Sequence, residues 1–153
     1  MTRRQNAQAT IGQDNFLSGL QAWVDEDAAL EGERESRAEA MQRMIGARQN
    51  KSTELRLNGL GLSSLPTQIG ELTDLRSLDL SGNQLTELPE SIGDLTALTT
   101  LGLNDNRLRT LPERIGDLTC KNWSRCLHNQ NVFTRIYVVV FLVFGSKYSS
   151  NFS

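Results

Sequence analysis

The fold is decided by a stretch of sequence that occurs twice, 23 residues apart: Leu75-Arg-Ser-Leu78-Asp-Leu80-Ser-Gly-Asn83-Gln-Leu85 and Leu98-Thr-Thr-Leu101-Gly-Leu103-Asn-Asp-Asn106-Arg-Leu108. Leucines at positions 55, 57 and 62 stand in the same phase and form an earlier copy. The second half of the unit also recurs, with Leu-Pro at 65–66, 88–89 and 111–112 and Ile-Gly at 69–70, 92–93 and 115–116. A fixed period over three copies predicts a solenoid of stacked coils, in which each coil contacts only its neighbours.

The first half of each copy predicts a short strand followed by a turn. Leucines that alternate with polar residues point one face of a strand into the core. These core leucines are Leu78, Leu80, Leu101 and Leu103. Asn83 and Asn106 follow where the chain leaves the strand, and buried amides at this point can satisfy backbone groups of adjacent coils. The first copy has Leu60 instead of this asparagine, as expected of a terminal repeat.

The second half of each copy predicts a tight helical return on the outer side. Pro89 is expected at the first helical position, where its fixed φ suits a helix and its missing N–H costs nothing. Ile92 and Leu95 are spaced to fill the inner side of this turn, and Gly93 allows close backbone packing. Together the halves predict an α/β solenoid with parallel strands on a concave side and helical or 3-10 turns on the convex side. The pattern resembles the leucine-rich repeat over residues 52–119.

Residues 14–50 are predicted to be helical and to cover the open end of the first coil. Asp14 or Asn15 can cap the first helix, whose apolar residues recur at helical spacing. These are Phe16, Leu17, Leu20, Trp23 and Val24. A second helix is expected from Glu35 to Arg48, with Ala38, Met41, Met44 and Ile45 on its inner side. Direct contact of these helices with a partner is the alternative to a purely structural cap.

A narrower resemblance rests on Trp23, on Arg37-Ala-Glu-Ala-Met-Gln-Arg43 and on the segment from Ser52 to Pro66. These stretches resemble the N-terminal region of leucine-rich-repeat effectors that bacteria inject by type III secretion, the IpaH-type class and its plant-pathogen relatives. In that class the repeats select a host protein and a separate C-terminal domain ligates ubiquitin to it. The repeats of that class are usually about 20 residues long, whereas the unit here is 23.

Composition divides the chain at about residue 118. All 18 acidic residues lie at or before Asp117 together with 12 Lys and Arg, whereas residues 118–153 hold four basic residues and no acid. The domain plan is therefore a polar leader (1–13), a helical cap (14–50), the repeats (51–119) and a non-repeat tail (120–153). The formal net charge of −2 gives no basic field for nucleic acid, and no stretch of about 20 apolar residues predicts a membrane span.

The tail leaves three interpretations open. The repeat fails after Thr119, because Lys121 and Ser124 stand where leucines are due. The apolar run 132–144 could be a strand that caps the last coil, or a contact with a membrane or partner. The third interpretation is a frameshifted or aberrant end of a truncated gene.

No residues stand out for catalysis, and no cofactor or metal is predicted. Cys120, Cys126 and His128 lack zinc-ligand spacing and a fourth ligand. Neither cysteine is followed by the x-Asp of the IpaH-type ligase, so this chain is not expected to be an enzyme or to bind a small-molecule substrate.

The candidate site is instead the outward side of the predicted strands, called here the concave face. It comprises Glu54, Arg56 and Asn58, then Ser77, Asp79 and Ser81, then Thr100, Gly102 and Asn104. These positions vary between copies while the leucines stay fixed, which suits a binding surface on a constant scaffold. The sequence therefore predicts a protein-binding module, and the resemblance implies a host protein as the target, secretion into the host cell and a role in virulence. The alternatives are the front part of an E3 ubiquitin-protein ligase and a non-functional remnant. If the chain is not an effector, it is expected in the bacterial cytoplasm.

Overall fold

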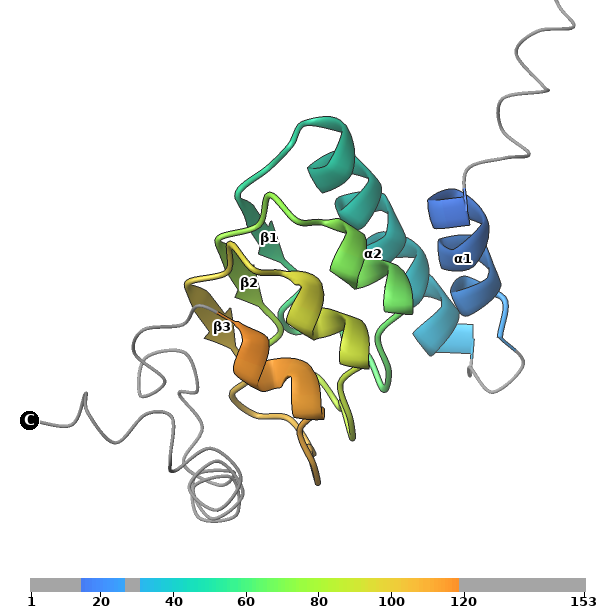
Figure 1. Cartoon of the computed structure of the whole chain (residues 1–153). Helices are drawn as coiled ribbons and strands as arrows, with labels where there is room; N and C mark the ends of the chain where they lie inside the picture. Colours follow the sequence, from blue (N-terminus) through green and yellow to red (C-terminus); the bar gives the residue numbers. More distant parts are fainter. Residues whose placement is uncertain (1–14, 27–30, 119–153) are drawn as a thin grey trace, which may run out of the picture.

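The computed structural model describes residues 15–26 and 31–118, which form a short solenoid with two helices against its first coil (Figure 1). Each coil has a strand, a turn and a 3-10 helix, so the strands line one side and the 3-10 helices another (Figure 1). This architecture confirms the predicted α/β solenoid with a helical cap. The leader (1–13) and the tail (120–153), with Lys121, Ser124, Cys120, Cys126 and His128, lie outside the described residues, so the interpretations of these segments stay predictions.

Three short parallel strands form one sheet in the order β1-β2-β3. They are β1 (Glu54–Arg56), β2 (Ser77–Asp79) and β3 (Thr100–Gly102). Each residue pairs with the one that stands 23 positions later, as Leu55 does with Leu78 and Leu78 with Leu101. The sequence period is therefore also the register of the sheet.

Stacked aliphatic side chains fill the space between the strands and the 3-10 helices. The side chains of Leu57, Leu80, Leu85, Ile92, Leu95 and Leu98 are all fully buried. Burial of each such side chain contributes about 2 kcal/mol of transfer free energy. Since each copy has leucine or isoleucine at the same positions, every coil buries these side chains against those of the next coil.

Asparagine side chains join the coils where the chain leaves each strand. The Asn83 amide nitrogen donates to the carbonyls of Leu57 and Leu80 at 2.9 and 2.8 Å, and its oxygen accepts the N–H of Leu62 at 3.0 Å. Asn106 does the same one coil later, accepting from Leu85 at 3.1 Å. Asn83 is 4% exposed, so these backbone groups have no ready alternative in water.

The outer returns are single turns of 3-10 helix. They are η2 (Thr67–Glu71), η3 (Glu90–Asp94) and η4 (Glu113–Asp117). Pro89 was expected as the first helical residue but instead precedes η3, with φ −67° and an extended ψ of 147°. This prediction was wrong because Pro89 is the N-cap residue. Its own backbone is extended, but its carbonyl accepts the first hydrogen bond of the turn, from the N–H of Ile92 at 3.0 Å. The proline positions the turn rather than beginning it.

The 3-10 helices stack closely enough to exclude a side chain at one position. A Cβ on Gly70 would lie 2.5 Å from the carbonyl oxygen of Ser91, and one on Gly93 would lie 2.5 Å from that of Arg114. The Glu90 carboxylate also accepts the N–H groups of Glu113 and Arg114, each at 3.3 Å, and so satisfies the start of the next turn. The convex side is therefore as tightly specified as the strands.

The N-terminal helices are α1 (Asn15–Val24) and α2 (Glu31–Gln49). The first buries Phe16, Leu20, Trp23 and Val24 and packs against α2 and η2. The buried line of α2 differs from the prediction by one position, because Ala38 is exposed while Arg37, Ala40, Met44 and Ala47 are buried. Met41 and Ile45 are half-buried at the edge of this line. The buried face of α2 includes Arg37, so the spacing of apolar residues alone could not identify that face.

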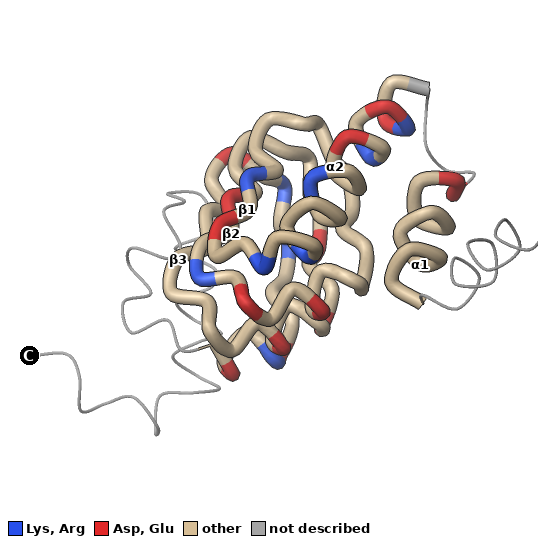
Figure 2. Tube along the Cα trace, turned by 90° about the horizontal axis from the view of Figure 1, so that it is seen from above, with Lys and Arg blue, Asp and Glu red and all other residues tan. Residues whose placement is uncertain are grey.

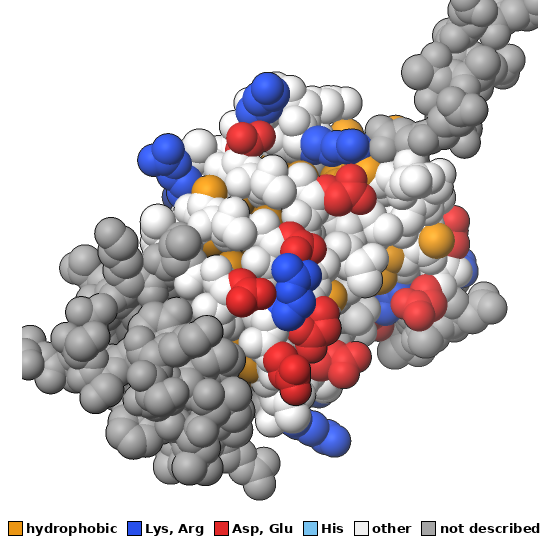
Figure 3. Space-filling view, in the orientation of Figure 1, with side chains coloured by type: hydrophobic (Ala, Val, Ile, Leu, Met, Phe, Trp, Pro, Cys, Tyr) orange, Lys and Arg blue, Asp and Glu red, His pale blue; other side chains and the backbone are white. Residues whose placement is uncertain are grey.

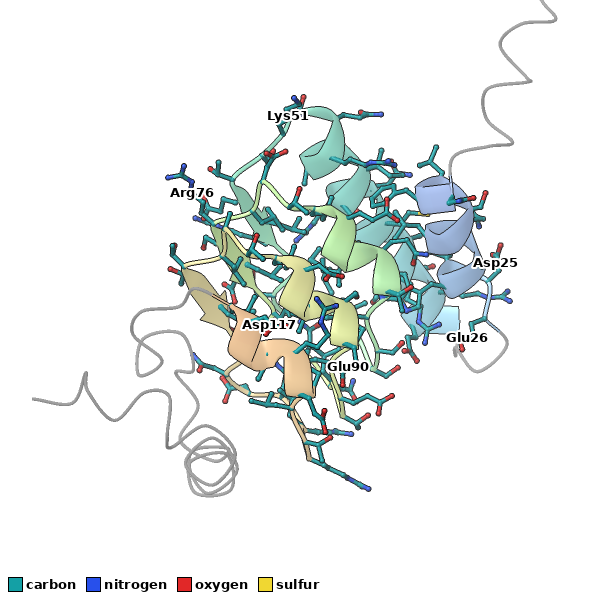
Figure 4. All side chains as sticks on the ribbon, viewed as in Figure 1. Asp25, Glu26, Lys51, Arg76, Glu90 and Asp117 are labelled. Atoms are coloured by element: carbon teal, nitrogen blue, oxygen red, sulfur yellow. The ribbon has the colours of Figure 1, made fainter. Side chains whose placement is uncertain are left out.

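Arg37 lies buried where α1, α2 and the first coil meet, and both terminal nitrogens of its guanidinium have partners there. Its guanidinium donates to the carbonyl of Trp23 at 2.7 Å and pairs with Glu26 and Glu33 at 3.1 and 3.2 Å. It lies 5.3 Å from the centre of the Trp23 ring, whose N–H donates to the hydroxyl of Ser64 at 3.1 Å. Figure 4 shows Glu26 at the end of α1, beside this junction. Both helices are thus tied to the first repeat by polar contacts as well as by apolar packing.

We expect this junction to weaken in acid. Burial raises the pKa of the Glu33 carboxyl, but the hydrogen bond from Ser63 and the charge of Arg37 outweigh it and hold the pKa below its ordinary 4.5. A lowered folded-state pKa gives stability that is present above the unfolded value and is lost as the pH falls through the folded one. Thermal melts from neutral to acidic pH should show a smaller acid loss for Ser63→Ala than for the parent chain. Ser18→Ala, on the exposed side of α1, is the control, and identical acid curves for all three would contradict the assignment.

A residue with a strained backbone lies just after the end of helix α2. Lys51 has φ +49°, and the N–H of Ser52 returns to the carbonyl of Ala47 at 2.9 Å, as in a helix end that normally uses glycine. Lys51→Gly should therefore raise the free energy of unfolding by about 1 kcal/mol, measured by urea denaturation. Asp105→Gly should gain less, because aspartate tolerates its φ of +54° better. A lower stability for Lys51→Gly would show that this backbone is not strained.

Candidate protein-binding face

The sheet register brings the nine residues of the concave face into three rows. Glu54 lies beside Ser77 and Ser77 beside Thr100, while Arg56, Asp79 and Gly102 form a second row. The third row, just after the strands, holds Asn58, Ser81 and Asn104. All nine are exposed or half-buried, whereas the leucines between them are buried. The structure thus places every predicted position on one surface.

Opposite charges meet at the β1 edge of the concave face. Arg56 donates from Nε and Nη2 to Glu54 Oε1 at 2.9 and 2.7 Å. This hydrogen bond, together with the charges of Glu54 and Asp79, raises the pKa of the Arg56 guanidinium. Both side chains are more than half exposed, so the pair contributes little to stability and is available to a partner.

Gly102 in the second row leaves room for two polar side chains of the neighbouring coil. A Cβ at this position would lie 2.8 Å from Asp79 Oδ1 and 3.0 Å from the hydroxyl of Ser81. Those two atoms are themselves 2.6 Å apart in a hydrogen bond, and the N–H of Ser81 donates to the same oxygen at 3.0 Å. The Asp79 carboxylate is therefore held in a fixed position beside the glycine.

Sequence reasoning missed the contribution of α2 to this surface. Arg43 on α2 donates from Nη1 to the carbonyl of Arg56 at 2.9 Å, so a helix side chain closes the outer edge of the sheet. Figure 2 shows β1 as the strand nearest α2. The contact leaves an open hollow lined by Arg43, Ala47, Ser52, Glu54, Leu55 and Arg56. No periodic signal could reveal it, because an exposed helical arginine has many possible neighbours.

The convex side differs from the concave face in its electrostatics. Figure 3 shows acidic side chains gathered around a basic one over the 3-10 helices. Arg114 pairs with Asp94 at 2.6 Å and with Asp117 at 3.4 Å, which raises its pKa. Figure 4 places Glu90 and Asp117 on this side, away from Lys51 and Arg76 near the strands. Glu90 and Asp94 join η3 to η4, whereas Asp117 pairs within η4.

Within residues 15–26 and 31–118, no group of His, Cys, Asp or Glu side chains is arranged to hold a metal ion. Neither α1 nor α2 has the length and apolar content that crossing a membrane would need.

This arrangement is the fold of a leucine-rich-repeat solenoid with an N-terminal helical cap, and stacked repeats of this kind present extended concave binding surfaces. Residues 51–122 match the sequence profile described as a leucine-rich repeat region. The chain is similar to YopM from Yersinia enterocolitica WA-314, with 34% identity and a TM-score of 0.55. That likeness covers 63% of this chain and 20% of YopM.

A second solved structure shares the fold at lower identity. It is the leucine-rich repeat domain of the type III effector XopL, with 23% identity and a TM-score of 0.53, covering 74% of this chain and 39% of that one. The chain thus spans well under half of each of these solved structures. A comparison with curated proteins gave no match.

Proposed function

We propose that this chain binds a target protein through its concave face, as the target-recognition part of a type III secreted effector. The observation that carries the proposal is the contrast between an invariant leucine lattice and the side chains that face outward from it. In the middle row, Arg56, Asp79 and Gly102 differ in charge and size although their backbones are in register. Repeats kept only for stability have no need of that diversity.

The effector part of the proposal is supported by the comparisons. This chain and YopM share about one residue in three over the matched region. The description of XopL names it a type III effector. The target in this proposal is a host protein met after secretion. A ubiquitin ligase activity of a longer protein stays a prediction from the resemblance alone.

Site-specific photo-cross-linking tests the binding surface. A benzophenone side chain at Ser77, in the centre of the concave face, should cross-link the full chain to a discrete protein in a eukaryotic cell extract. The same group at Thr67, exposed on η2, is the matched control. Unlabelled parent chain should compete with the Ser77 product. Equal products from both positions, or products that resist competition, would refute a specific concave site.

A translocation assay tests the delivery. A reporter enzyme fused after the chain should reach the host cytosol from bacteria with an intact type III apparatus and not from a secretion-defective strain. Export that is equal in the two strains would refute the effector assignment while leaving the binding proposal intact.

A further inference from the structure

The hollow between α2 and β1 is the starting point for a more specific inference, which rests on the proposed function. Its volume is about 340 Å³, and Glu54 and Arg56 on its wall are also members of the concave face. A partner lying on the concave face would therefore pass directly over it. Interfaces concentrate their binding energy where one side chain enters such a depression.

The lining of the hollow combines an apolar floor with a rim of two arginines and Glu54. Ala47 and Leu55 are 7% and 5% exposed and form the floor. Arg43 and Arg56 on the rim have side chains that are 38% and 70% exposed. A ligand group that suits the whole site must be apolar in its body and attracted to guanidinium groups.

Existing contacts favour one orientation of each guanidinium group. Arg43 pairs with Glu39 at 2.9 Å and donates to the Arg56 carbonyl, while Arg56 forms its two hydrogen bonds with Glu54. A group fixed before binding loses little conformational entropy on binding. Because each charge is already partnered, a carboxylate from outside would gain little and would be repelled by Glu54.

We propose that the hollow receives an aromatic side chain of the partner, with its ring over the floor and its face against Arg43 and Arg56. An aliphatic side chain would contact only the floor, and a carboxylate would be repelled by Glu54. An aromatic ring contacts both the floor and the two arginines, since arginine stacks on aromatic faces. Residues 31–118 contain no Phe, Trp or Tyr, so the ring must come from elsewhere than the repeats.

The test uses the full ¹⁵N-labelled chain and N-acetyl-tyrosine amide as the probe, followed by NMR. Saturable shifts are expected at the amides of Ala47, Ser52 and Leu55 and at the side-chain N–H of Arg56. N-acetyl-leucine amide and N-acetyl-glutamate amide should produce much smaller shifts. Comparable shifts from either control probe, or shifts spread over the whole surface, would overturn the proposal.

Conservative variants separate ring stacking from simple charge. Arg43→Lys and Arg56→Lys keep the charge but lose the planar group, and each should weaken probe binding about two- to fivefold, the size of an exposed cation–π contact. Arg76→Lys changes an exposed arginine outside the hollow and should leave the titration unchanged. Titrations that are the same for all three variants would refute the role of the guanidinium groups.

The outcome is separable from that of the proposed function. A hollow that takes no aromatic probe, on a chain whose Ser77 cross-link still forms, overturns only the inference about the ring. Probe binding without any specific cross-link overturns the concave site instead.

Discussion

Gly93→Ala is expected to lower the free energy of unfolding by about 3 kcal/mol, near the upper end of what overpacking costs. The new Cβ would lie 2.5 Å from the carbonyl oxygen and 2.6 Å from the Cβ of Arg114, and the oxygen belongs to the backbone of the next coil. Relief requires η3 and η4 to separate, which opens the core between them. Urea denaturation followed by circular dichroism measures the loss.

Gly46→Ala provides the matched control for this substitution. Gly46 lies within α2, and a Cβ there would have no neighbour within 4 Å. Alanine in a helix interior is more favourable than glycine by about 1 kcal/mol, so this variant should be more stable than the parent chain. The same change would then act in opposite directions at two positions. Equal effects would mean that the close approach of the 3-10 helices does not limit the fold.

Asn83→Ala should cost about 4 kcal/mol, because two buried backbone groups lose their partner and each unsatisfied group costs about 1–3 kcal/mol. The groups are the N–H of Leu62 and the carbonyl of Leu57, whereas the Leu80 carbonyl still accepts from Asn106 at 2.9 Å. Both groups belong to the first coil and Asn83 to the second, so the loss should reduce the cooperativity of unfolding as well as its midpoint.

Two further asparagines calibrate that result. Asn106→Ala should cost less than Asn83→Ala, since Asn106 is only half-buried and water can replace part of its contacts. Asn58→Ala, at an exposed position, should change stability by less than about 0.5 kcal/mol. A ranking in which Asn83→Ala behaves like Asn58→Ala would refute the structural role of the buried amide.

The repeats could be predicted from sequence because a residue's position in the repeat determines whether its side chain is buried or exposed. A leucine at 78 or 101 has one possible direction once the strand is recognised, and the period then sets the register of the sheet. The same logic placed Asn83 against the backbone of the preceding coil. The proline error at position 89 was small, since both placements use the same fixed φ.

The cap was less predictable because its burial depends on polar partners. Arg37 is 3% exposed, although arginine is one of the residues least often buried. It is buried only because Glu26, Glu33 and the Trp23 carbonyl meet it there, and these come from two helices whose packing no spacing rule gives. The hollow beside Arg43 escaped for the same reason, since it exists only once α2 lies against β1.

Because strands pair residues one repeat apart, such a chain can gain or lose whole repeats during evolution. The hydrogen bonds that join coils run between residues 23 apart or within a few positions of that spacing. Recombination that deletes or duplicates one whole unit would rejoin surfaces that already fit, while α1 and α2 continue to cover the same first coil. Descendants of one gene can therefore differ in the number of rows that they present without a new packing problem.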